Sequence, residues 1–124
     1  MQKVSYRIQL IMKELRKRTI KLYQKDNGDC PVISWLESLN DSVRYRVKSR
    51  LARVSLGNLG EYKMLGDSLG ELKFKFGSGY RLYFSEIDGE IILLLCGGDK
   101  SSQKKDIKLA REYLNNYLGS IDHG

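Results

Sequence analysis

Two neighbouring stretches of alternating side chains, residues 71–76 and 80–86, constrain the fold most. Large apolar residues recur at every second position in both: Leu72, Phe74, Phe76, Leu82 and Phe84. Successive side chains of a strand point to opposite faces of its sheet, so each stretch predicts a strand with one apolar face. The intervening Gly77-Ser78-Gly79 predicts a three-residue hairpin loop.

This hairpin predicts a charged sheet surface opposite the apolar one. With a three-residue loop, Lys75 lies opposite Arg81 and Lys73 lies opposite Tyr83. A one-residue slip would mix charged and apolar side chains, so the pattern fixes which residues share a face. Like charges in opposed positions destabilise a sheet by up to about 1 kcal/mol, and a phosphodiester between them would relieve the repulsion. For the lysines alone an ordinary solvated face is the simpler interpretation; with Arg81 and Tyr83 beside them we favour a solvent-facing anion site.

Helix and turn signals complete the domain. Pro31 can open a helix, Asn40 and its neighbours offer N-caps for another, and Gly57 ends it. The predicted elements are a strand at 18–24, helices from Pro31 to Leu39 and from Val43 to Leu56, a loop at 57–70, the two hairpin strands, a strand at 90–96 and a helix from Ser102 to Leu118. This β-α-α-β-β-β-α order predicts an α+β domain, with a helix pair packed on one face of an antiparallel sheet.

The second predicted helix is amphipathic and basic. Val43, Val47, Leu51 and Val54 form a narrow apolar stripe. Basic residues flank this stripe: Arg44, Arg46, Lys48, Arg50 and Arg53. Some are expected to cover the edge of the core with their stems, and the mixed surface would also suit phosphates or an acidic partner helix.

The segment Gly97-Gly98-Asp99-Lys100 lies between the last strand and the last helix. Consecutive glycines can leave backbone N–H groups free for an anion, and a helix N-terminus adds partial positive charge. A Gly-Gly pair is more often an ordinary turn, but Lys100, Lys104 and Lys105 strengthen the positive field here.

Bulk composition narrows the class of protein. The 124 residues suffice for one domain, and 22 Lys+Arg against 15 Asp+Glu give a net charge of +7. Such a charge attracts polyanions, although small proteins are also basic for solubility alone. Cys30 and Cys96 show no zinc-type spacing, and His123 is the single histidine. We therefore expect no metal site, no cofactor and no histidine-based catalysis, and a cytosolic protein without a signal peptide or membrane span.

Three segments resemble a known family. They are GYRLYF at 79–84, LLLCGGDKSSQKKDI at 93–107 and WLESL at 35–39. Together they are similar to the RelE/ParE toxin superfamily, in its branch of addiction-module killer proteins related to the HigB toxins. The resemblance covers nearly the whole chain after residue 17, so we divide the chain into an N-terminal extension (1–17, with Met12 an alternative start), a RelE-like domain (18–118) and a C-terminal tail (119–124).

The resemblance implies a type II toxin that an antitoxin encoded by a neighbouring gene neutralises. RelE-like members cut messenger RNA on the ribosome without a metal, by attack of a ribose 2′-OH on the adjacent phosphate. By position, Arg81 matches the phosphate-binding arginine, Lys73 and Lys75 resemble basic residues of the preceding strand, and Lys100 matches a further cation. The family's C-terminal acid has no clear counterpart, and Tyr113 is the nearest candidate.

These matches predict roles for each residue. Lys73 or Lys75 is the expected general base, while Arg81 and Lys100 stabilise the charged phosphorane. Tyr83 is expected to stack on a base. The predicted RNA-binding cations are Lys104, Lys105, Arg46 and Arg50. Two alternatives stay open: a ParE-like inhibitor of DNA gyrase, and a protein that binds RNA or antitoxin without catalysis.

Overall fold

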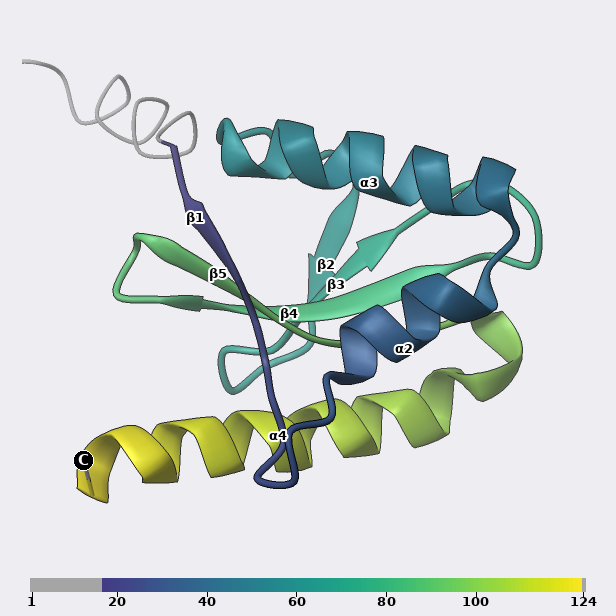
Figure 1. Ribbon diagram of the computed structural model, residues 1–124. Helices are drawn as coiled ribbons and strands as arrows, with labels where there is room; N and C mark the ends of the chain where they lie inside the picture. The colour runs from purple at the N-terminus through teal and green to yellow at the C-terminus, as the bar shows by residue number, and fades with distance from the viewer. Residues whose placement is uncertain (1–16, 124) are drawn as a thin grey trace, which may run out of the picture.

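The computed structural model describes residues 17–123, which form a three-layered α+β domain (Figure 1). Helices α2 (Pro31–Ser38) and α3 (Asp41–Ser55) cover one face of a five-stranded sheet, and α4 (Gln103–His123) covers the other. The strands are β1 (Thr19–Leu22), β2 (Tyr62–Met64), β3 (Gly70–Lys73), β4 (Arg81–Ile87) and β5 (Ile91–Gly98). Their order in the sheet is β1-β5-β4-β3-β2.

Local signals set the ends of the helix pair as predicted. Pro31 occupies the first turn of α2, where its missing N–H costs nothing. The Asn40 side chain caps α3 by accepting a hydrogen bond from the Val43 amide at 2.9 Å. Gly57, with a φ of +100°, ends the helix, and its amide donates to the Val54 carbonyl.

Two features of the sheet differ from the prediction. The sheet is mixed, because β1 pairs in parallel with β5. The predicted loop at 57–70 also contains β2, an exposed strand that pairs with β3, so the order is β-α-α-β-β-β-β-α. Both depend on pairing between distant or very short segments, for which the sequence offers no periodic signal.

The register of the β3–β4 hairpin is shifted by two residues. Lys73, not Lys75, lies opposite Arg81, and Glu71, not Lys73, lies opposite Tyr83. The reason is a longer loop: the Phe74 amide donates to the Tyr80 carbonyl at 3.0 Å, so five residues rather than three make the connection. A shift of two residues preserves the faces, as the alternation requires.

The two faces of the sheet enclose separate cores. Against α2 and α3, the buried residues include Val32, Val47, Leu72, Leu82, Phe84, Ile92 and Leu94. Against α4, they include Tyr23, Leu69, Tyr83, Leu93, Leu95, Ala110 and Leu114. The predicted solvent-facing cationic surface is therefore wrong in part, because α4 packs over that face.

The last helix is longer than predicted. A 3₁₀ turn, η1 (Lys100–Ser102), precedes α4, which continues to His123 rather than ending near Leu118. Most of the expected N-terminal extension, residues 1–16 with Met12, lies outside the described residues. No helix within residues 17–123 is long and apolar enough to cross a membrane.

Candidate functional site

The candidate site begins with a row of polar side chains on the α4 face of the hairpin. Cross-strand pairing places Lys73 opposite Arg81 and Glu71 opposite Tyr83. Glu71 and Tyr83 are fully buried, Lys73 is half-buried, and the Arg81 side chain is 14% exposed. The row therefore runs from the core under α4 to the surface at the end of the sheet.

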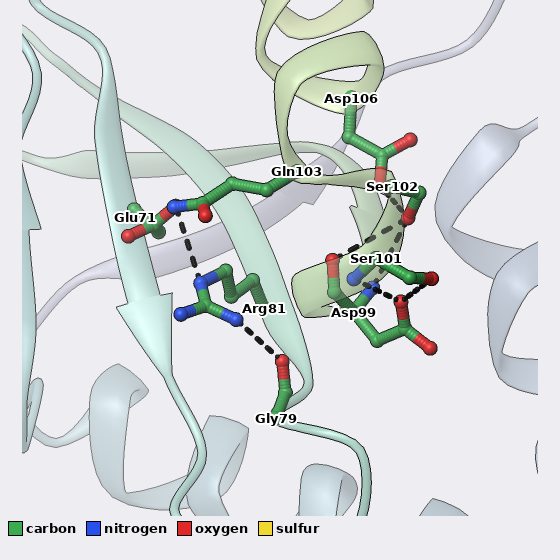
Figure 2. Close-up of polar contacts among 8 residues, drawn as sticks. All are labelled: Glu71, Gly79, Arg81, Asp99, Ser101, Ser102, Gln103 and Asp106. Atoms are coloured by element: carbon green, nitrogen blue, oxygen red, sulfur yellow. Dashed lines mark hydrogen bonds and ion pairs between the residues drawn. The ribbon is translucent and has the colours of Figure 1, made fainter.

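Arg81 is held by two contacts (Figure 2). Its Nε lies 3.6 Å from Oε2 of Glu71, and its NH1 donates to the Gly79 carbonyl at 2.7 Å. The Gln103 amide, at the start of α4, donates to the same Glu71 oxygen at 2.9 Å. The repulsion expected between cations on this face is thus offset by a carboxylate of the protein itself. Sequence reasoning missed Glu71, although its spacing from Lys73 placed it on the same face.

Lys100 approaches Arg81 across the Gly79 turn. The Lys100 amide donates to the Ser78 carbonyl at 3.4 Å. A Cβ added to Gly79 would lie 3.3 Å from Arg81 NH1 and 3.5 Å from the Lys100 Cβ, so the turn lies directly between these residues. Gly79 also has a φ of +76°, which favours glycine. The structure thus gathers Lys73, Arg81 and Lys100 at one end of the sheet.

The Gly97–Gly98 pair is not the predicted anion nest. Both residues lie in β5 and pair with Leu82 and Arg81 of β4. Their missing side chains make room for neighbours: a Cβ on Gly97 would overlap the Trp35 ring, and one on Gly98 would overlap the Asp106 carboxylate. The two glycines therefore allow Trp35 and Asp106 to pack closely against the backbone of β5.

The donor groups at the start of α4 and in the turn before it form hydrogen bonds with the chain's own acidic residues. Asp99 and Ser102 form a capping box, in which Asp99 Oδ1 accepts from the Ser101 amide at 2.8 Å. Hydrogen bonds from Ser101 lower the pKa of Asp99, so it remains ionised here. The Ser102 hydroxyl donates to Asp106, which is buried in the first turn of α4. These carboxylates occupy the positive end of the helix that we expected to attract a phosphate.

Two of the predicted site residues are placed elsewhere. Lys75 lies in the loop beyond β3, where its exposed ammonium pairs with Glu61 at 3.3 Å. The Tyr83 ring is buried beneath α4, so its predicted stacking on a base is wrong for this structure. Burial, with the Glu71 carboxylate nearby, raises the pKa of the Tyr83 phenol well above its ordinary value.

The basic residues of α3 belong to the opposite face of the sheet. Arg50 is buried and donates to the carbonyls of Leu59, Glu61 and Lys73, which contradicts its predicted RNA-binding role. Arg46 remains exposed, with its guanidinium carbon 3.7 Å from the centre of the Phe76 ring. Neither is gathered with Arg81.

At the start of α4, Lys104 and Lys105 are exposed, and their predicted contact with RNA stays a prediction.

Tyr113 does not supply the acid missing from the site. It stacks on Tyr23 with ring centroids 4.9 Å apart, and burial raises the pKa of its phenol. Ten residues along α4 from Gln103 correspond to about 15 Å, which separates Tyr113 from the Arg81 end of the helix. Among the side chains that the structure describes, in residues 17–121, His, Cys, Asp and Glu form no group of three that could hold a metal ion.

Comparison with solved structures places the fold in a class. The chain is similar to the E. coli toxin RelE, solved as a double arginine-to-alanine variant in the free state, with a TM-score of 0.55 and 19% identity over 81% of this chain and 97% of RelE. The fold is therefore RelE-like. No protein-family model matches the chain.

A sequence relative then gives the family. The chain is 43% identical over 79 residues to an uncharacterised protein of Haemophilus influenzae (strain Rd), a match that spans 63% of this chain and 80% of that protein. This chain belongs to the same family as the Haemophilus protein.

Proposed function

We propose that this protein is the toxin of a type II toxin–antitoxin system and inhibits translation by cleaving messenger RNA on the ribosome, in the cytosol. The observation that carries the proposal is the gathering of Lys73, Arg81 and Lys100 at one end of a RelE-like sheet. Basic side chains gathered at one end of a sheet can bind a phosphodiester and stabilise the extra charge of its transition state. An antitoxin, encoded by a neighbouring gene, is the proposed partner that blocks this site.

The geometry supports a metal-independent transesterification. Arg81 and Lys100 would hold the scissile phosphate, since they flank the open Gly79 turn. The ribose 2′-OH attacks phosphorus and the P–O5′ bond breaks. Lys73, as the neutral amine, takes the 2′-OH proton, and the departing 5′ oxygen takes a proton from water. The hydroxide left by that water takes the proton back from Lys73. This leaves a 2′,3′-cyclic phosphate and a 5′-OH end. Lys75 has no part in the step, because it is paired with Glu61 in the loop.

The test is cleavage of a ribosome-bound message by purified wild-type protein and by the Arg81→Ala variant, mapped by primer extension. Removal of one preorganised charge from a transition state costs about 10²–10³-fold in rate, and we expect a loss of that size. Arg53→Ala, which removes an exposed arginine of α3, is the matched control and should cleave like the wild type. Unchanged cleavage by Arg81→Ala contradicts the assignment. Growth arrest with DNA damage and intact messages would instead indicate a gyrase inhibitor.

A further inference from the structure

The least expected feature of the site is a buried carboxylate. Glu71 is 0% exposed, and its carboxylate is faced by Arg81, by Gln103 and by the Tyr83 hydroxyl of the opposite strand. Burial of a charged group is costly unless its partners are well placed, and an apolar residue would often stabilise such a position better. Because burial of this carboxylate costs free energy, we expect Glu71 to have a role other than stabilising the fold.

We propose that Glu71 is a positioning residue which, fixed by Gln103, sets the orientation of the Arg81 guanidinium toward the phosphodiester. The inference rests on the proposed function and deepens it. Glu71 does not touch the substrate, because α4 covers it completely.

Two contacts restrain the orientation of the guanidinium: a hydrogen bond from NH1 and an ion pair at Nε, which has no hydrogen-bond partner among the described residues. This group is planar, so fixing two of its nitrogens fixes the plane. Glu71 lies against Nε at 3.6 Å, and the Gly79 carbonyl accepts from NH1 at 2.7 Å. The remaining nitrogen, NH2, makes no hydrogen bond with the described residues, so its donors can serve a ligand. Lys73, in contrast, has no such restraint on its ammonium group within the same residues.

Gln103 determines where the carboxylate itself points. Its amide donates to the same Glu71 oxygen that faces Arg81, and it is the first residue of α4 (Figure 2). The capping box of Asp99 and Ser102 fixes the backbone directly before it. The position of Arg81 is therefore coupled to the start of α4 through one side chain from each of three elements.

A simpler role for Glu71 is to neutralise part of the positive charge of the site. The Glu71→Gln variant distinguishes this role from the positioning of Arg81. This change keeps the shape of the side chain and removes its charge. If Glu71 only weakens the positive field, the variant binds RNA more tightly and cleaves faster. If Glu71 positions Arg81, the variant binds at least as tightly but cleaves more slowly, because misplacement of a reacting or stabilising group by about 1 Å can cost about 100-fold.

The experiment measures binding and cleavage separately in the full-length protein. Binding uses a 2′-O-methyl RNA oligonucleotide, which cannot be cleaved, and cleavage uses ribosome-bound message. We expect Glu71→Gln to retain or improve affinity and to lose about 100-fold in cleavage rate. Glu112→Gln makes the same charge change at an exposed site of α4 and should match the wild type. Wild-type or faster cleavage by Glu71→Gln overturns the proposal.

A second measurement does not depend on RNA cleavage. The Arg81 Nε–H signal in a ¹H–¹⁵N spectrum can be assigned by its loss in Arg81→Lys. We expect it to shift and broaden in Glu71→Gln and in Gln103→Leu, which removes the side-chain amide that contacts Glu71. If the signal is unchanged in both variants, the positioning role is wrong, whatever the protein cleaves. If the Arg81 signal changes in both variants but the wild-type protein does not cleave messages, the proposed function is wrong. Glu71 and Gln103 would then still position Arg81.

Discussion

Arg50 and Arg81 are two partly or fully buried arginines on opposite faces of the same sheet, and they use their donors differently. Arg50 is 9% exposed, and its guanidinium donates to the backbone carbonyls of Leu59, Glu61 and Lys73 while lying over the Phe74 ring. Arg81 faces one carboxylate and one carbonyl, and its NH2 makes no hydrogen bond with the described residues.

The comparison shows how a structural arginine differs from a candidate functional one. Each of the three guanidinium nitrogens of Arg50 donates to a backbone carbonyl, which joins α3, the 59–61 segment and the end of β3. Burial lowers the pKa of Arg50 without making it neutral, since arginine stays charged in proteins. Arg81 keeps capacity for a ligand and is supported by a buried acid. The three predictions below, beginning with the largest expected effect, test this division.

Arg50→Met should destabilise the fold strongly. The change removes the Arg50 donor from the carbonyls of Leu59 and Lys73, whereas the Glu61 carbonyl keeps its hydrogen bond from the Lys73 amide. At about 1–3 kcal/mol for each unsatisfied group, we expect a total loss of about 2–5 kcal/mol. Urea unfolding should show a lower Cm with an unchanged m-value. Lys48→Met, an exposed cation of the same helix, is the control. A loss below about 1 kcal/mol would mean that the Arg50 contacts do not hold the hairpin.

Tyr83→Phe should leave stability unchanged or raise it by up to about 1 kcal/mol. The Tyr83 hydroxyl is buried beside the Glu71 carboxylate of the opposite strand and has no other hydrogen-bond partner among the described residues, so its removal changes little. Tyr23→Phe is the matched control, because the Tyr23 hydroxyl accepts from Asn116 and its loss should cost about 0.5 kcal/mol. A clear destabilisation by Tyr83→Phe would show that the α4 face depends on this hydroxyl after all.

Arg46→Ala should have a small effect, in the destabilising direction. The Arg46 guanidinium stacks on Phe76 at the surface, and exposed cation–π contacts contribute about 0.5–1 kcal/mol. Thermal unfolding beside Arg53→Ala, an arginine without such a ring contact, measures the difference. A loss as large as that of Arg50→Met would show that ring stacking, rather than the carbonyl contacts, distinguishes the arginines of α3.

Much of the candidate site could be predicted from the sequence, but the residues packed around its cations could not. The alternation in residues 71–86 correctly placed Lys73 and Arg81 on one face, and Lys100 was predicted to join them from the β5–α4 connection. The same reasoning wrongly included Lys75 and Tyr83, because a loop two residues longer shifted the register and α4 covered the tyrosine. Glu71 was missed because its contribution depends on Gln103, far along the chain.

The sequence alone determined the faces of the hairpin, the ends of α2 and α3 and the positive charge, because these depend on the geometry of residues close together in the chain. Tertiary structure alone decided the parallel pairing of β1 with β5, the layer formed by α4 and the burial of Arg50. These features depend on which segments, far apart in the sequence, bury their apolar surfaces against each other. No local periodicity carries that information.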